Sequence, residues 1–120
     1  MKSYNFGWST NKYHNKKCTY KGMTFDSKKE MNYYIKLEYL QKAKEISELK
    51  RQVEFVLLET FKLENKTYRK TKYIADFTYK DKNGKYHVVD TKSEATKKDK
   101  VYQLKKKLLA WRYGLEIEEV

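Results

Sequence analysis

Proline is absent from this 120-residue chain, cysteine occurs once, and no long apolar segment is present. Without proline-rich, repeated or low-complexity tracts, we expect no linker and one compact domain over residues 18–120. Cys18 alone cannot form an internal disulfide, which fits a reducing compartment. The first residues carry no apolar run, and no segment approaches the roughly 20 apolar residues of a membrane span. We therefore expect a soluble cytoplasmic protein that does not enter a membrane.

Positive charge dominates what is present. Lysine and arginine number 28 against 16 aspartates and glutamates, which gives a formal charge of +12. Such an excess favours a polyanionic partner, and nucleic acid is the commonest, although ribosomal proteins and anionic-lipid binders share the property. Twelve tyrosines and two tryptophans supply large side chains for the core or for stacking on bases. Residues 1–17 are basic, aromatic and aperiodic, and we interpret them as an arm whose Lys12, Lys16 and Lys17 contact nucleic acid.

Hydrophobic spacing changes along the chain between the periods of helices and strands. Ser27 and Glu30 form a capping-box pattern that begins a helix, and Gly114 is placed to end a second one. The expected elements are a hairpin at 18–25, a helix from 27 to about 44, strands at 53–63, 72–80 and 85–93, a helix from 96, and a strand at 115–120. This order predicts an α/β fold with a restriction-endonuclease-like αβββαβ core, in which helices flank one mixed sheet.

The second predicted helix has two distinct groups of residues. Val101, Leu104, Leu108 and Trp111 recur at helical spacing, which predicts the face that packs on the core. Lysines crowd the same helix, either as a solvated face or as phosphate contacts. We expect nucleic-acid contacts from Lys97, Lys98, Lys105 and Lys106.

The strands at 72–80 and 85–93 carry three charged residues that we expect on one face. Between these strands, Gly84 suits the last position of a three-residue loop with a type I turn and a left-handed glycine. In that register Asp81 faces Lys85, and Asp76 lies directly opposite Asp90. Lys92 follows Asp90 by two residues and points to the same side.

A two-residue Asn83-Gly84 turn is the alternative. It pairs Lys82 with Lys85 and sets Asp76 opposite Thr91, on the other face from Asp90. The local sequence excludes neither register. The three-residue loop is preferred because it keeps the charged groups together.

Asp76 in Ile74-Ala75-Asp76-Phe77, then Asp90-Thr91-Lys92, resembles the motif of the PD-(D/E)XK nuclease superfamily. Glu30 matches the acidic residue that these nucleases often carry on the preceding helix, whereas Ala75 replaces the proline of the family's name. A second resemblance covers nearly the whole chain and rests on Lys12-Tyr13-His14-Asn15-Lys16-Lys17, Phe25-Asp26-Ser27-Lys28-Lys29-Glu30 and Tyr73-Ile74-Ala75-Asp76-Phe77. These segments are similar to a phage and prophage family of unknown function that is generally placed among these nucleases. The carboxylate order is also similar to that of the Tn7 transposase endonuclease subunit and of phage junction-resolving endonuclease I.

The resemblance implies a role for each of these residues. Asp76 and Asp90 would share Mg²⁺, with Mn²⁺ as a substitute, and the backbone carbonyl of Thr91 would be a third ligand. Glu30 would complete the shell or hold a second ion. Lys92 would orient or deprotonate the attacking water, or stabilise negative charge; its acidic neighbours favour stabilisation.

Each residue also has a plainer explanation. Glu30 stands where a capping box needs an acid, and Lys92 can form a simple surface ion pair. Asp76 opposite Asp90 is harder to explain structurally, because like charges directly across strands repel.

Together with the resemblance, these observations predict a Mg²⁺-dependent DNA endonuclease, phage-encoded and active in the host cytoplasm. The resemblance alone implies branched DNA, such as a Holliday junction, as its substrate. A homodimer is the expected form if a junction is the substrate, because resolution needs two coordinated cuts. A non-catalytic nucleic-acid-binding protein and a structure-specific RNA nuclease remain alternatives, because charge alone serves the first and the same metal chemistry serves the second.

Overall fold

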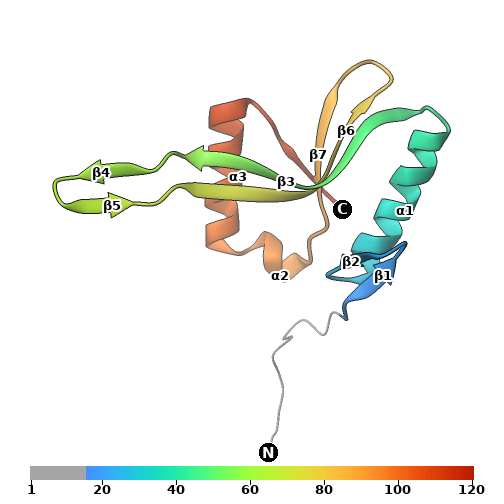
Figure 1. Ribbon diagram of the computed structural model, residues 1–120, viewed down its shortest axis with the longest axis horizontal. Helices are drawn as coiled ribbons and strands as arrows, with labels where there is room; N and C mark the ends of the chain where they lie inside the picture. Colours follow the sequence, from blue (N-terminus) through green and yellow to red (C-terminus); the bar gives the residue numbers. More distant parts are fainter. Residues whose placement is uncertain (1–15) are drawn as a thin grey trace, which may run out of the picture. The chain divides into compact units, whose positions relative to one another are not determined.

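The computed structural model describes residues 16–120 and divides the chain into two compact units, Met1–Glu38 and Tyr39–Val120. The first unit contains the antiparallel strands β1 (Cys18–Tyr20) and β2 (Met23–Phe25) (Figure 1). Lys21 and Gly22 form the turn between them, with φ of 51° and 80°, so the predicted hairpin is confirmed. The predicted N-terminal arm, residues 1–17, lies almost wholly outside the described residues, and Lys12 lies outside them too.

Helix α1 (Lys28–Lys42) follows the hairpin. The Ser27 hydroxyl accepts a hydrogen bond from the Glu30 amide at 3.1 Å, so the predicted N-terminal cap is confirmed. In the first unit the hairpin packs on the helix, because the Phe25 ring lies 5.4 Å from that of Tyr34.

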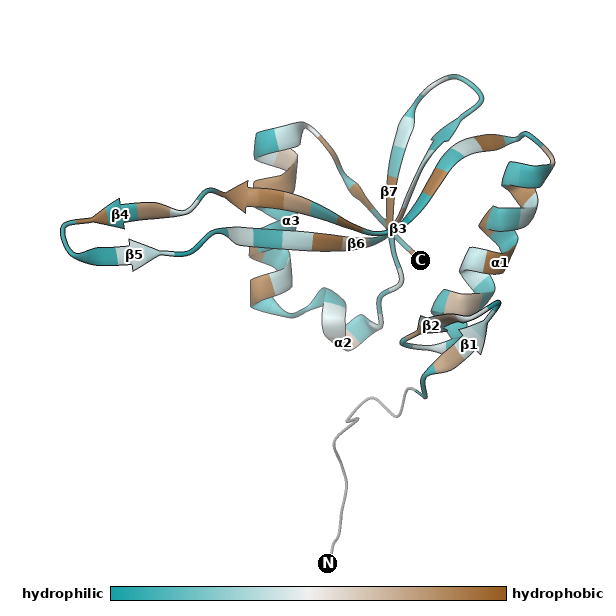
Figure 2. Cartoon of the chain, viewed as in Figure 1, coloured by the Kyte–Doolittle hydropathy of each residue, from teal (hydrophilic) through white to brown (hydrophobic). Residues whose placement is uncertain are grey.

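The second unit is built on a four-stranded sheet in the order β3-β6-β7-β8. Strands β3 (Ile46–Leu58), β6 (Thr71–Asp81) and β7 (Tyr86–Asp90) pair antiparallel, whereas β8 (Ile117–Glu119) is parallel to β7. Figure 2 shows hydrophobic and hydrophilic bands alternating along β3 and β6, as expected for strands with a buried face. The α/β fold class, the αβββαβ element order and the mixed sheet are confirmed.

A two-stranded ribbon continues the β3–β6 pair beyond the sheet. It consists of β4 (Phe61–Leu63) and β5 (Lys66–Tyr68), which pair antiparallel and extend away from the rest of the second unit (Figure 1). The sequence indicated a strand as far as Leu63 but not its return. Glu64 makes the turn with φ of 53°, a conformation that favours glycine or asparagine, so no turn signal marked it.

Two helices connect β7 to β8. The short α2 (Glu94–Lys97) is capped by Ser93, and α3 (Lys100–Tyr113) is capped by Asp99 and ends at Gly114, whose φ is 66°. The predicted helix end at Gly114 is therefore confirmed. In place of the one helix predicted from residue 96, the structure has two helices, each with its own N-terminal cap. Helix α3 packs on the sheet through a core formed by Phe55, Leu57, Tyr73, Ala75, Val88, Tyr102, Leu109 and Ile117.

The predicted core face of α3 is largely wrong. Val101, Leu104 and Trp111 are 61%, 55% and 79% exposed, whereas Tyr102 and Leu109 are buried. Tyr102 can occupy a core position because its hydroxyl donates to Glu119 Oε2 at 2.5 Å, which satisfies its polar end. Leu108 alone of the predicted residues packs against the core.

Every helix among residues 16–120 is too short or too polar to cross a lipid bilayer.

Candidate functional site

The β6–β7 hairpin sets the position of Asp76 and Asp90. Its loop closes through the Gly84 amide, which donates to the Asp81 carbonyl at 3.0 Å, and Gly84 has φ of 82°. The paired residues run from Lys80 with Tyr86 to Phe77 with Val89, and one further step brings Asp76 opposite Asp90. The three-residue loop is thus confirmed, and the two-residue alternative is wrong.

Asp76 and Asp90 meet where the two strands begin to separate. The Asp76 amide donates to Asp90 Oδ1 at 3.2 Å instead of continuing the backbone ladder. Asp90 is 1% exposed. Burial raises its pKa to about 6, and the nearby carboxylate of Asp76 contributes to the increase. Burial and the neighbouring carboxylate of Asp76 therefore both oppose ionisation of Asp90.

Tyr73 and Lys92 both contact the same oxygen of Asp90. The Tyr73 hydroxyl donates to Asp90 Oδ2, and the Lys92 ammonium lies 3.1 Å from that oxygen. Both contacts favour the ionised carboxylate and so oppose the effect of burial on its pKa. The pKa of Tyr73 is itself raised by burial and by Asp90, so its hydroxyl remains a neutral donor. Tyr73 was not predicted as a site residue.

Thr91 fixes the carboxylate of Asp76. Its amide and its hydroxyl both donate to Asp76 Oδ2, at 2.9 and 2.8 Å. Two donors on one oxygen define the orientation of the side chain. The metal-ligand role that was predicted for the Thr91 carbonyl stays a prediction.

The C-terminal residue supports the backbone on either side of Thr91. The Val120 amide donates to the Asp90 carbonyl at 2.9 Å, and the Lys92 amide donates to the Val120 carbonyl at 3.1 Å. These bonds extend the parallel pairing of β7 with β8 past the end of both strands. They hold Asp90 and Lys92 in the extended conformation that directs both side chains to one side.

A hollow of about 360 Å³ opens beside Lys92. Lys72 and Lys105 line it together with Lys92, and the ring of Tyr102 lies 4.6 Å from the Lys92 ammonium. Lys72 also forms an ion pair with Glu54 at 3.1 Å. The hollow is therefore basic, and an anionic group that entered it would lie next to the Asp90–Lys92 pair.

The other predicted contact lysines have varied environments. Lys97 pairs with Glu94 and Lys106 with Glu119, each at 3.2 Å, whereas Lys98 is exposed. In the first unit, Lys16 is exposed and Lys17 lies 3.7 Å from Asp26. Of the helix lysines that were predicted to bind nucleic acid, Lys105 alone lines the hollow beside Lys92.

Glu30 belongs to the first unit, where it is 3% exposed near the start of α1. Its amide donates to the Ser27 hydroxyl at 3.1 Å, a contact of the helix cap that does not involve its carboxylate. Its predicted place in the metal shell of Asp76 and Asp90 stays a prediction. Within residues 16–120, no three or more histidine, cysteine or acidic side chains form a group that could hold a metal ion.

Comparison with known proteins supplies a family. A family model described as "protein of unknown function (DUF1064)" matches residues 10–118. The chain belongs to this family. No curated protein and no solved structure matches it. The match carries no activity, substrate or metal, so the resemblance to PD-(D/E)XK nucleases stays a prediction.

Proposed function

We propose that this protein is a Mg²⁺-dependent DNA endonuclease that hydrolyses phosphodiester bonds at the Asp76–Asp90 pair. The observation that supports this most is the position of Asp90. A buried carboxylate beside a second carboxylate is costly for folding, and removing either charge would relieve the repulsion. Such an arrangement is typical of a site that a cation completes.

The residues present fit a hard divalent cation. Asp76 and Asp90 offer carboxylate oxygens, the ligands that Mg²⁺ prefers, and Mn²⁺ accepts the same set. The Thr91 carbonyl and Glu30 are the further ligands implied by the resemblance. A bound divalent ion supplies Lewis acidity at the scissile phosphate.

The chain's own side chains prepare the site. Tyr73 and Thr91 orient the two carboxylates through hydrogen bonds, so little reorganisation is needed when a substrate binds. Lys92 holds a positive charge 3.1 Å from Asp90, where it offsets negative charge that develops on the phosphate. Lys105 lines the hollow beside it and is placed to contact an adjacent phosphate of the strand.

The proposed substrate is branched DNA. The proposed process is phage recombination or DNA processing in the host cytoplasm. Both rest on the resemblance to junction-resolving nucleases. Resolution of a junction needs two cuts, and we propose a homodimer for that reason.

The test is cleavage of labelled DNA. Four-way junctions, forks, linear duplexes and matching RNA are incubated with Mg²⁺, Mn²⁺ or EDTA. We expect metal-dependent cutting of a DNA substrate that disappears in Asp76→Asn and Asp90→Asn while binding persists. The matched control is Glu116→Gln, which removes one acidic charge from an exposed residue directly before β8 and is expected to retain full activity. Binding without cutting of any substrate with either metal would instead identify a nucleic-acid-binding protein, and cutting of RNA alone an RNA nuclease.

A further inference from the structure

The β4–β5 ribbon, residues 59–70, is hereafter the arm. It is distinct from the N-terminal arm that the sequence predicts for residues 1–17. All six residues of its two strands are exposed, so burial in a core does not account for its sequence. Figure 1 shows it extending from the β3–β6 pair, away from α3 and the rest of the second unit. A two-stranded ribbon without a core is marginally stable, and a partner that covers it would add to its stability.

The arm is ordered by contacts of its own. Phe61 and Tyr68 are paired across the strands, and their rings stack at 4.8 Å with an interplanar angle of 9°. The Lys66 ammonium lies 4.9 Å from the Tyr68 ring. Cross-strand aromatic pairs and cation–π contacts stiffen an isolated ribbon, so the arm can keep its shape in solvent.

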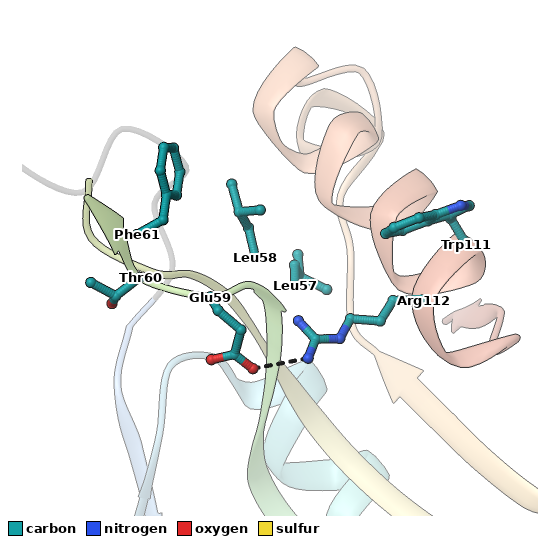
Figure 3. Close-up of a pocket in the computed structure, with 7 residues that line it drawn as sticks. All are labelled: Leu57, Leu58, Glu59, Thr60, Phe61, Trp111 and Arg112. Carbon is teal, nitrogen blue, oxygen red and sulfur yellow. Dashed lines mark hydrogen bonds and ion pairs between the residues drawn. The ribbon is translucent and has the colours of Figure 1, made fainter. Parts of the chain in front are cut away.

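The base of the arm is attached to helix α3. Arg112 pairs with Glu59 at 2.9 Å, and the Tyr113 hydroxyl donates to the Val56 carbonyl at 2.7 Å. Figure 3 shows the Glu59–Arg112 pair below a hollow of about 660 Å³, which separates Leu58 and Phe61 from Trp111 on the helix. These contacts fix the direction of the arm while its strands remain open to solvent.

The charge of the arm is positive where it projects furthest. Residues 61–69 contain Lys62, Lys66 and Arg69 against the single acidic Glu64. Nearer the sheet, Lys70 and Lys72 share one acidic partner, Glu54, which offsets one of their two charges. The ribbon therefore carries a net positive charge that reaches its distal part, and a polyanion is its complementary partner.

We propose that the arm enters the major groove of B-form duplex DNA. The major groove is about 12 Å wide and admits a two-stranded ribbon without distortion, whereas the minor groove is about 6 Å wide and takes a ribbon only where the DNA is bent or the groove is widened. The A-form RNA major groove is deep and narrow, which excludes the arm. This inference rests on the proposed function for its nucleic-acid partner, and it selects duplex DNA over duplex RNA. A second copy of the chain fits less well, because two basic arms repel.

The test compares binding to DNA and RNA duplexes of one sequence by fluorescence anisotropy in EDTA. The double variant Lys62→Gln, Lys66→Gln is expected to bind DNA about 10-fold or more weakly and to lower the salt slope by about 2. The control Lys42→Gln, Lys85→Gln removes two exposed charges elsewhere and is expected to bind more tightly than the arm variant. The wild-type preference for DNA over RNA is expected to fall toward one in the arm variant alone. Thermal unfolding of both variants verifies that they fold.

Methylation by dimethyl sulfate distinguishes the grooves, because guanine N7 lies in the major groove and adenine N3 in the minor groove. We expect the wild type to protect N7 and the arm variant to lose that protection. Equal DNA affinity of the arm and control variants, protection of N3 instead of N7, or equal arm-dependent binding to RNA would overturn the proposal. A change of oligomeric state in the arm variant, seen by sedimentation, would assign the arm to a second copy and also overturn it. Because EDTA prevents metal-dependent cutting, failure of the nuclease proposal is detected separately.

Discussion

The hydroxyl of Tyr73 donates a hydrogen bond to the carboxylate of Asp90, and both side chains are buried. A phenylalanine at position 73 would pack the same ring into the core but would leave the acid without this donor. Tyr73 is therefore a positioning residue for the carboxylate of Asp90. The hydrophobic pattern of its strand indicates only that its ring is buried.

Tyr73→Phe is expected to move the acidic limb of the pH–rate profile to higher pH by about one unit. The Tyr73 hydrogen bond lowers the pKa of Asp90, so its removal raises that pKa above about 6. Tyr102→Phe is the matched control, because its hydroxyl bonds to Glu119. A limb that stays in place, or that moves equally in both variants, would contradict the role of Tyr73.

Asp90→Asn is expected to change how stability depends on pH. The pKa of Asp90 is raised in the folded state, so the folded protein binds this proton more tightly than the unfolded chain does. Wild-type stability relative to the variant should therefore fall as pH rises from 4 to 8, by about 1–3 kcal/mol in total. Urea denaturation without divalent metal measures this difference at each pH.

The pKa of His87 also differs from its ordinary value, which is the reason for comparing two proteins. Burial opposes protonation of its ring, but hydrogen bonds to Asp81 and Glu118 outweigh it and raise its pKa. This contribution is also lost as pH rises, yet it is common to wild type and Asp90→Asn and cancels in their difference. A difference that stays constant from pH 4 to 8 would show that the pKa of Asp90 is not raised.

Lys92→Met is expected to slow cleavage about 100- to 1000-fold while duplex affinity changes only a few-fold. The ammonium beside Asp90 acts on charge that develops during the reaction, whereas many other lysines supply ground-state attraction. Single-turnover rates at saturating enzyme measure the effect. Lys85→Met removes an exposed lysine of the β6–β7 loop and should cut at the wild-type rate. Equal losses in duplex affinity and in cleavage rate would show that Lys92 contributes to DNA binding alone.

The packing face of α3 is open to a direct test. Leu109→Ala removes a fully buried side chain and should cost about 2–5 kcal/mol of unfolding free energy. Leu104→Ala removes the same atoms from the same helix at an exposed position and should cost about 0.5 kcal/mol or less. Chemical denaturation of the two variants decides, and similar losses would restore the face that the sequence predicts.

The hairpin was predictable because local rules determine it. Gly84 can adopt the left-handed conformation, and once the loop length is chosen, the two-residue period of strands brings Asp76 opposite Asp90. The loop length itself was not determined by the sequence, since Asn83-Gly84 also suits a tighter turn. Gly114 ended α3 for a similar local reason.

The features that were missed depend on tertiary contacts. The helical spacing of Val101 and Leu104 suggested a core face, but Tyr102 takes it because Glu119, on a strand beyond the helix, satisfies its hydroxyl. Tyr73 on β6 contacts Asp90 on the neighbouring strand β7, a relationship that periodicity does not encode. The return strand of the arm was missed because Glu64 adopts a turn conformation that its residue type does not signal.

Binding of Mn²⁺ shows whether Asp76 and Asp90 hold a divalent ion, and it can be measured without knowing the substrate. Free Mn²⁺ is measured by electron paramagnetic resonance during a titration at pH 7.5. We expect at least one bound ion that is lost in both Asp76→Asn and Asp90→Asn and retained in Glu116→Gln. Undiminished Mn²⁺ binding by the two aspartate variants would contradict the proposed metal site.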